Sequence, residues 1–582
     1  MRAPKLAMLR RHLWPQRRTL LLGVLALLMV NGFGVAIPLM VRRVVDDLQV
    51  GFSYSKVLGQ AGWIIGLATL MALVRLLSRL LVFGVGRQVE VDLKQQLFDH
   101  LLRQEPAWVQ ATASGDVLSR ATSDVENVRR LLGFSVLSLT NTVLAYALTL
   151  PAMVLIDPWL SLAAVALYPL MLLSVQRFGG AIMREQRRQQ QALADLTNLL
   201  QEDLSGINAI KIYGQEPVEE RAFALRNRAY RDAALGPARY RSVMFPLIEG
   251  IASISLLVLL GLGSSQLESG RLGIGDLVAL ILYVERLVFP TALLGFTLNT
   301  FQTGQVSLER IEELLRRQPE IVSPPSPLSL PGGRARGALE ARELTIHYPG
   351  RHQPALDHLS FQIAPGELVA VVGPVGCGKS TLARALGRLV EVPAGQLFLD
   401  GFDLTTLNLV DLRRQVALVP QEGFLFTATL ADNLRYGAPE ASLEQVRQAA
   451  ELAQLADDVR GFPDGYQTLV GERGITLSGG QRQRTALGRA LLMDSPLLVL
   501  DDALASVDNR TASAILQAVR GQRQRTVLLI SHQLSAAAAC DRILVIEAGR
   551  LVQEGHHREL VREPGAYRRL WEREQAERLQ TA

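Results

Sequence analysis

Cysteine and lysine are both scarce in this 582-residue sequence. The only cysteines are Cys377 and Cys540, which argues against a disulfide framework and favours a reducing compartment around the part of the chain that holds them. Lysine occurs only at positions 5, 56, 94, 211 and 379, so arginine supplies nearly all of the positive charge. The first apolar run lacks a small-residue cleavage site and is too long for a signal peptide, so we expect no cleaved leader.

A strong excess of either charge is also missing, because the formal net charge is +6. A modest positive balance fits a nucleic-acid binder, but many of the arginines flank apolar segments, where positive charge retains loops on the cytoplasmic side of a membrane. Hydrophobic residues make up 49% of the chain. This share, in a chain too long for one domain, predicts a membrane protein of several domains without a nucleic-acid partner.

Six long apolar stretches fill the first half of the sequence. Each approaches the roughly 20 residues that a helix needs to cross a bilayer. One such stretch is compatible with a buried core helix, but six in succession predict a membrane domain. The predicted spans cover residues 19–40, 58–85, 131–156, 160–178, 245–267 and 274–298.

The loops between these spans are very unequal. Asp157 and Pro158 alone separate the third and fourth spans, whereas long charged segments follow the second and the fourth. Both segments have a helical pattern, so we expect helices that continue into the cytoplasm and return, with tips near 113–116 and 210–215 that dock on nucleotide-binding domains. An arginine-rich N-terminus places both long loops and the C-terminal half inside the cell.

Few ionisable residues fall within the predicted spans. Arg75 and Arg79 are four residues apart on one helix face, and Glu285 and Arg286 lie inside the sixth span. Charges at this depth usually face a partner or an aqueous cavity. They therefore either line a polar translocation cavity, or form an intramembrane ion pair or extend to the membrane interface.

The second half contains a complete phosphate-binding loop of the pattern G-x-x-x-x-G-K-S. It follows a β-like run at 367–372 and precedes a helix-like run at 382–386, which is the context that such a loop requires. Its glycines let successive N–H groups point at phosphate oxygens, with Lys379 on the β/γ-phosphates and the Ser380 hydroxyl on Mg²⁺. The alternative interpretation, a glycine-rich surface turn, would not require a strand before the loop and a helix after it. The loop consists of Gly373, Pro374, Val375, Gly376, Cys377, Gly378, Lys379, Ser380 and Thr381.

Proline and glycine mark a linker between the two halves of the chain, at 323–327 and 331–333. Beyond it, β-like and helical runs alternate, as in an α/β nucleotide-binding fold. The predicted fold is thus an α-helical membrane domain of six transmembrane helices with long cytoplasmic extensions, followed by an α/β P-loop NTPase domain. The predicted divisions are an N-terminal amphipathic segment at 1–18, a transmembrane domain at 19–315, a linker at 316–338 and a nucleotide-binding domain at 339–582.

Further motifs follow in an order that resembles bacterial ABC exporters of the half-transporter type, in which one membrane domain precedes one nucleotide-binding domain. The resemblance covers the whole chain, and so many motifs in register are too specific for chance. Besides the P-loop, they are Tyr348 (A-loop), Gln421 (Q-loop), 471–474 (X-loop), 477–481 (the LSGGQ signature), Asp501 (Walker B), 506–508 (D-loop) and His532 (H-loop).

The resemblance implies a role for each of these residues. Tyr348 would stack on adenine, and Gln421 would contact both Mg²⁺ and the attacking water. Asp501 would hold the metal through water, and His532 would orient the attacking water at the γ-phosphate. The cofactors implied are ATP and Mg²⁺.

The resemblance also implies that a single chain cannot complete an ATP site. In the family, the signature of one subunit faces the P-loop of the other, so two ATP molecules are held between two nucleotide-binding domains. The implied location is the bacterial cytoplasmic membrane, with the N-terminus and the nucleotide-binding domain in the cytoplasm. The residues expected to act on the partner's ATP are Ser478, Gly479, Gly480 and Gln481.

One position departs from the family's pattern. The Walker B aspartate is normally followed by a glutamate that polarises the attacking water, but this chain has Asp502. Aspartate is one methylene shorter, and a displacement of about 1 Å can slow an aligned reaction about 10²-fold. An intact signature beside this change resembles the subunit of heterodimeric multidrug and peptide exporters that carries the degenerate site. The alternative is a homodimer that hydrolyses ATP slowly through Asp502.

These observations predict ATP-driven export of drugs, peptides or lipids by a heterodimer, with membrane lipids and an amphiphilic substrate as the other partners. The second subunit would be a half-transporter with a Walker B glutamate and an altered signature. An ATP-gated channel or a regulatory ABC protein is the competing class, and Asp502 is the one feature in its favour. The remaining ATP-site residues are intact and favour a pump.

Overall fold

The computed structural model describes residues 13–51, 53–471, 474, 476–521 and 524–581. The chain divides into two compact units, which are described separately. The membrane unit comprises the chain up to Leu102 together with Ser114–Arg317, and the nucleotide unit comprises Arg103–Ala113 together with Gln318–Ala582.

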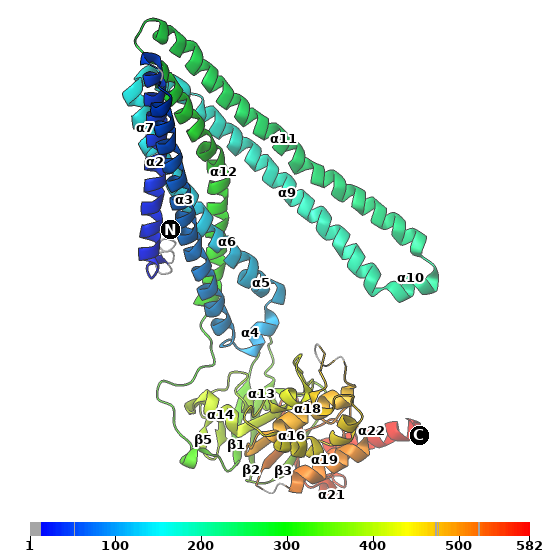
Figure 1. Cartoon of the computed structure of the whole chain (residues 1–582). Coiled ribbons are helices and arrows are strands. Elements are labelled where there is room, and N and C mark those ends of the chain that lie inside the picture. The colour runs from blue at the N-terminus through cyan, green and yellow to red at the C-terminus, as the bar shows by residue number, and fades with distance from the viewer. Residues whose placement is uncertain (1–12, 52, 472–473, 475, 522–523, 582) are drawn as a thin grey trace. The chain divides into compact units, whose positions relative to one another are not determined.

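Six helical rods in the described part of the chain are long and apolar enough to cross a membrane, which confirms the predicted number. The third rod is built from α5, α6 and α7 joined by two wider turns, and the fourth from α8 and α9. The helices of this unit are α2 (Arg17–Val50), α3 (Tyr54–Leu101), α5 (Ser114–Ser119), α6 (Val125–Arg130), α7 (Val136–Ile156), α8 (Pro158–Val165), α9 (Tyr168–Ser205), α10 (Ile207–Tyr213), α11 (Glu216–Glu268) and α12 (Ile274–Arg316) (Figure 1).

Helices α9 and α11 form a long antiparallel hairpin that confirms the helical continuation predicted for the second long segment (Figure 1). The short helix α10 closes its tip, where the side chain of Tyr213 is 74% exposed. The hairpin continues well past the apolar spans because the sequence beyond Phe178 keeps a helical pattern while its residues become polar.

The two-residue connection before α8 follows directly from its sequence. The Asp157 carboxylate accepts a hydrogen bond from the backbone N–H of Leu160 at 2.8 Å and so caps the helix. Pro158 occupies the first turn, where its missing N–H leaves no partner unsatisfied. A cap and a proline together let the fourth rod start immediately after the third ends.

A buried carboxylate joins the end of α12 to the third rod. Asp124 lies between α5 and α6, and its side chain is almost completely buried. It receives an ion pair from Arg310 at 2.8 Å and a hydrogen bond from the Ser307 hydroxyl at 2.7 Å. Arg310 also pairs with Asp116 at 2.6 Å, so one guanidinium bridges two acids on the third rod.

The nucleotide unit contains a six-stranded sheet in the order β10-β9-β3-β8-β7-β6 and a four-stranded antiparallel sheet in the order β2-β1-β4-β5. In the larger sheet all neighbours pair in parallel except β10, which pairs antiparallel with β9 at one edge. The strands are β1 (Leu339–Ile346), β2 (Leu356–Ile363), β3 (Leu368–Val372), β4 (Leu397–Leu399), β5 (Phe402–Asp403), β6 (Val416–Val419), β7 (Leu497–Asp501), β8 (Thr526–Ile530), β9 (Arg542–Glu547) and β10 (Arg550–Gly555).

Each face of the six-stranded sheet has its own hydrophobic core. Alternate side chains of one strand contribute to opposite cores: Val369 and Val371 face the smaller sheet and α13, whereas Ala370 and Val372 face α18 and α19. The central strands are therefore apolar throughout, as buried parallel strands are. The helices are α13 (Lys379–Leu386), α14 (Leu409–Gln415), α15 (Leu430–Arg435), α16 (Leu443–Leu452), α17 (Ala456–Arg460), α18 (Gly479–Leu492), α19 (Asn509–Gly521), α20 (Leu534–Ala537), α21 (His557–Leu560) and α22 (Ala566–Thr581). Together these elements confirm the predicted fold class.

The segment of the first long loop that associates with the nucleotide unit lies earlier than predicted. It is Arg103–Ala113, which contains α4 (Pro106–Ala111). The Glu105 carboxylate accepts hydrogen bonds from the backbone N–H groups of Ile321, at 3.1 Å, and of Glu320. Most of the predicted tip at 113–116 belongs instead to the membrane unit, where α5 starts at Ser114.

Replacing Asp124→Ala tests the tie between α12 and the third rod. We expect a loss of about 2 kcal/mol in unfolding free energy, less than for a fully buried pair because Arg310 is partly exposed. Thermal melting of the purified protein would then shift down by roughly 5 °C. The matched control is Arg316→Ala, which removes the exposed pair with Glu312 at 2.9 Å and should change the melting temperature little. Equal shifts in both variants would contradict the assignment.

Candidate ATP site

The topology of the larger sheet brings the predicted ATP-site segments to one edge. The P-loop follows β3, Gln421 lies two residues beyond β6, Asp501 ends β7, and His532 lies two residues beyond β8. These strands are adjacent and parallel, in the order β3-β8-β7-β6. Because the carboxyl ends of parallel strands meet at the same edge, the loops that follow them converge there.

The P-loop holds a nearly buried cation, Lys379, that forms no ion pair with an acidic side chain among the described residues. The Lys379 ammonium donates to the carbonyl oxygens of Gly373 at 2.7 Å and Pro374 at 2.9 Å, and the residue is 5% exposed. Its third contact is the Cys377 sulfur at 3.6 Å, and a charge held by neutral groups is suited to receive phosphate oxygens. Glycine is required at Gly378, where φ is +104° and a Cβ would lie 2.3 Å from the Ala355 carbonyl oxygen.

Ser380 and Asp501, two of the three residues predicted for Mg²⁺, are in contact, whereas the side chain of the third, Gln421, bonds Asp502. The Ser380 hydroxyl donates to Asp501 Oδ1 at 3.0 Å. Burial raises the pKa of Asp501, with a further contribution from the charge of Asp502, while the bond from Ser380 lowers it. A nearby cation would offset the effect of burial and hold this carboxylate ionised.

The donor set fits a magnesium ion that is shared with a nucleotide. Within the described residues, no group of three or more His, Cys, Asp and Glu side chains could hold a metal by itself. Magnesium usually keeps several waters and takes one or two carboxylates together with substrate phosphates. Ser380 and Asp501 at the end of the P-loop therefore match the requirement for such a shared site.

The three predicted catalytic residues meet around the Asp502 carboxylate. One oxygen accepts the backbone N–H of His532 at 3.3 Å, and the other accepts the Gln421 side-chain amide at 3.4 Å. Asp502 has φ of +52°, a left-handed conformation that aspartate tolerates better than most residues. The short side chain is therefore held in place from two directions.

Tyr348 lies beside the helix that follows the P-loop. Its hydroxyl is 3.3 Å from the Thr381 hydroxyl, and the ring is half-buried against the core that includes α13. The aromatic residue predicted for adenine is thus next to the predicted phosphate site, although it precedes β2 in the sequence.

The signature forms the first turn of α18. The Ser478 hydroxyl accepts the N–H of Gln481 at 3.2 Å, and the Gln481 side chain accepts the N–H of Ser478 at 2.9 Å. Ser478 and Gly479 are exposed. Among the described residues, no hydrogen bond joins the signature to the P-loop of this chain, which leaves this helix end open to another partner. In the preceding X-loop, Glu472 and Arg473 lie outside the described residues, as do positions 1–12 of the predicted N-terminal segment.

Gln483 connects three motifs and was not among the predicted site residues. Its amide nitrogen donates to the Gln421 carbonyl at 3.4 Å, and its amide oxygen accepts the N–H of Ser506 at 2.9 Å. The residue is nearly buried in α18, two positions after the signature. A polar residue inside an amphipathic helix was the available signal, but its partners are more than 20 residues away in the sequence, at separations of 62 and 23.

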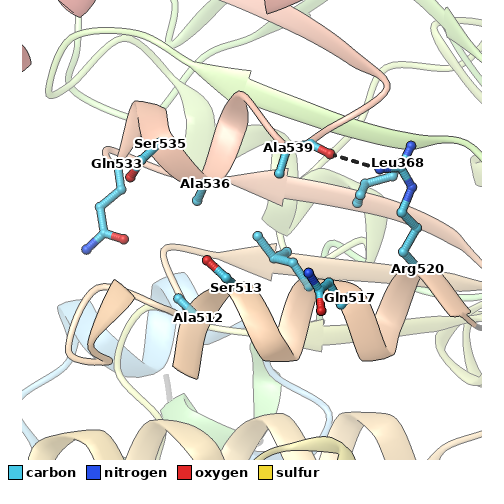
Figure 2. A pocket seen from close by; sticks show the side chains of 10 residues that line it. Leu368, Ala512, Ser513, Gln517, Arg520, Gln533, Ser535, Ala536 and Ala539 are labelled. Atoms are coloured by element: carbon cyan, nitrogen blue, oxygen red, sulfur yellow. Dashed lines mark hydrogen bonds between the residues drawn. The ribbon is translucent and has the colours of Figure 1, made fainter. Parts of the chain in front are cut away.

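A separate pocket of about 310 Å³ lies between α19 and the segment that contains α20. Figure 2 shows its lining residues, among them Ser513, Gln517 and Gln533, with Arg520 donating to the Ala539 carbonyl at 3.4 Å. None of the predicted catalytic or phosphate-binding residues lines it. It is therefore distinct from the candidate ATP site.

A P-loop domain with a signature helix, in one chain whose described residues include six helical rods long and apolar enough to cross a membrane, is typical of an ATP-driven membrane transporter. The chain belongs to the ABC transporter family: residues 20–291 match the ABC transporter transmembrane region and residues 356–505 match the ABC transporter model of the ATP-binding domain. It is thus a multi-pass membrane protein whose second unit is a transport-coupled ATPase that binds ATP.

Named relatives cover nearly the whole chain. The multidrug resistance-like ATP-binding protein MdlA of Escherichia coli is 32% identical over 96% of this chain and 94% of its own length. The ATP-dependent lipid A-core flippase of Dechloromonas aromatica is 31% identical over 93% of this chain and 92% of its own. A solved bacterial Atm1-family ABC exporter with ATP bound is 28% identical, with a TM-score of 0.78, over 98% of this chain and 99% of the solved one.

Replacing Gln483→Leu tests whether this side chain positions the Q-loop and the D-loop. The change keeps similar bulk but removes both hydrogen bonds, so we expect ATPase turnover to fall by about tenfold, equivalent to about 1.4 kcal/mol, while ATP binding is retained. The variant Gln483→Glu keeps the acceptor for Ser506 and loses the donor to Gln421, so it should show an intermediate loss. Wild-type turnover in both variants, measured beside nucleotide binding, would refute the positioning role.

Proposed function

We propose that this chain is one half of a heterodimeric exporter that moves amphiphilic substrates across the bacterial cytoplasmic membrane at the expense of ATP. The observation that carries the proposal is a set of ATP-site residues, complete except at Asp502, in one chain with six apolar rods, three of which line a cavity. The names of the relatives, a multidrug resistance-like protein and a lipid flippase, support amphiphilic molecules as the substrate class.

The proposed roles are those that the family resemblance implies, and the meeting of these residues at one edge of the sheet supports them. Lys379 and the backbone N–H groups of the P-loop bind the phosphates, and Tyr348 stacks on the adenine ring. Ser380, Gln421 and, through water, Asp501 would hold Mg²⁺, which would supply charge neutralisation on the phosphate oxygens. Gln421 and His532 position the attacking water next to the Asp502 carboxylate.

The proposed division of labour between two subunits rests on Asp502 and on the open signature. Asp502 is one methylene shorter than glutamate, and both of its oxygens already accept hydrogen bonds. The shorter side chain therefore reaches less far toward an attacking water molecule than glutamate would. The exposed turn at Ser478 is intact and would complete the ATP site of a partner with a Walker B glutamate and an altered signature. A homodimer with slow hydrolysis through Asp502 is the second candidate, favoured by the firm support of that carboxylate.

The proposed arrangement places the nucleotide unit and the tips of the long helical extensions in the cytoplasm. The arginine-rich residues before the first rod support this orientation. The exposed tip of α10, with Ile212 and Tyr213 uncovered, supports docking on a nucleotide-binding domain of the partner. The division into residues 1–18, 19–315, 316–338 and 339–582 belongs to the same proposal.

Transport by the reconstituted complex tests the export function. We expect vesicles with outward-facing nucleotide units to accumulate an amphiphilic dye in their lumen when Mg-ATP is added. Lys379→Ala should weaken ATP binding at this chain's site, because the phosphates lose their buried positive charge. ATP-dependent flux that only dissipates a preset dye gradient would instead identify a gated channel and refute export.

Two substitutions distinguish the heterodimer from the homodimer. In a heterodimer, Asp502→Asn should reduce ATPase turnover only modestly, because little hydrolysis takes place at that site. Ser478→Arg should reduce it far more, since it removes the cap of α18 and places a cation at a helix end that favours an anion. Steady-state ATPase is measured for each variant with an otherwise wild-type partner. Near-complete loss in both would make Asp502 the working catalytic carboxylate and overturn the heterodimer.

A further inference from the structure

A large cavity lies within the membrane unit, bounded by α9, α11 and α12. Its volume is about 1380 Å³, and most of its lining is apolar. Phe245 of α11 and Phe289 of α12 both line it, and the Phe289 side chain is 71% exposed. Large aromatic faces that are exposed inside a cavity are suited to hold the apolar body of a small molecule.

Two carboxylates line the same cavity at membrane depth, Glu249 of α11 and Glu285 of α12. Within the described part of the chain, neither has a hydrogen bond or an ion pair. An unpaired carboxylate is unfavourable in apolar surroundings, and an ionisable residue inside a span usually marks a functional site.

The adjacent arginine does not neutralise Glu285. Arg286 points toward α2, where its guanidinium donates to the backbone carbonyl and the side-chain oxygen of Asn31, both at 3.1 Å. Gly34 makes room for it, because a Cβ there would lie 1.2 Å from the guanidinium. Successive residues of a helix do not face each other, so Glu285 is left to the cavity. The ion pair considered from the sequence is thus not formed between these two residues.

The two carboxylates lie at similar levels along the helix bundle. The hydroxyl of Tyr168 donates to the carbonyl oxygen of Val284, which places the start of α9 beside Glu285. Glu249 lies between two contacts of α11 with the fourth rod, the bond from Ser255 to the Ala164 carbonyl and the ring contact of Tyr240 with Phe178. Interpolation between these contacts puts Glu249 opposite the first turn of α9.

The positive charges of the cavity lie at its other end. Arg241 precedes Glu249 by eight residues on α11, which is about 12 Å along the helix. Arg184 and Arg187 are 16 and 19 residues beyond Tyr168 on α9, about 24 and 28 Å along the helix. All three line the cavity. The acidic and basic groups are thus separated along the cavity rather than paired.

We propose that Glu249 and Glu285 determine specificity by binding the positive charge of an organic cation, while Phe245 and Phe289 contact its apolar body. The cavity therefore takes cationic amphiphiles in preference to anionic ones. The inference rests on the proposed export function, since it names the substrate class of that transporter. It is independent of which subunit hydrolyses ATP.

The test uses tetraphenylphosphonium and tetraphenylborate, two ions of nearly the same shape and opposite charge. Equilibrium dialysis measures the binding of each to the assembled, nucleotide-free transporter. Protein-free detergent at the same concentration supplies the background, because the two ions partition differently into detergent. We expect each single Gln variant to weaken tetraphenylphosphonium binding by about fivefold and the double variant by about tenfold or more. Tetraphenylborate binding should not decrease.

Arg241→Gln is the matched control, since it removes a charge from the same cavity at the opposite end. It should not weaken tetraphenylphosphonium binding. Each variant is checked for assembly by its elution and by nucleotide binding. Wild-type tetraphenylphosphonium affinity in the assembled double variant would overturn the proposal, as would equal loss of both ions. Dialysis requires no ATP, so a failure of vectorial transport with charge-dependent binding intact would refute export alone.

Discussion

The parallel pairing of β3, β8, β7 and β6 is the constraint on which the ATP site depends. It brings the P-loop, Asp501, His532 and Gln421 from four separate parts of the chain to one edge of a sheet. The pairing is stable because these strands are apolar on both faces and two hydrophobic cores cover them. A rigid sheet then holds short polar side chains at fixed positions, as phosphate chemistry requires.

The membrane unit is subject to a different constraint. A charged side chain is unfavourable in apolar surroundings unless a polar or oppositely charged group contacts it. The Arg286 guanidinium donates hydrogen bonds to two oxygens of Asn31 on α2 and occupies the space left by the missing side chain of Gly34. The Asp124 carboxylate forms an ion pair with Arg310 and accepts a hydrogen bond from Ser307, near the end of α12. Glu249 and Glu285 differ from these two residues, because they face an open cavity and neither has a hydrogen bond or an ion pair within the described residues. A buried charge with a partner stabilises the bundle, whereas one facing a cavity is available to a ligand.

The contacts around Asp502 connect this carboxylate to other motifs of the nucleotide unit. Its oxygens accept bonds from the Q-loop side chain and from the backbone of the H-loop. Gln483 then joins the Q-loop backbone to the D-loop from the helix that starts with the signature. The signature helix is therefore linked to the Asp502 carboxylate through two side-chain amides, those of Gln483 and Gln421.

The sequence by itself determined the elements and the chemical types. The six spans follow from apolar length, because a chain in a bilayer must satisfy its backbone hydrogen bonds within each helix. The P-loop, Walker B and signature residues follow from local spacing, since each motif is a short segment with its own geometry. The departure at Asp502 is likewise visible in the sequence, because it is a difference in residue type that does not depend on the fold.

Only the tertiary structure decided which of these residues meet. Three contacts join segments that are distant in the sequence. Gln483 bonds the Gln421 backbone, Arg286 bonds Asn31, and Arg103–Ala113 associates with the nucleotide unit. A helical pattern predicts which residues share a face of the helix, but it does not predict which other element packs against that face. The cavity of Glu249 and Glu285 likewise exists only because α9, α11 and α12 pack around it, and no local pattern records the space between three helices.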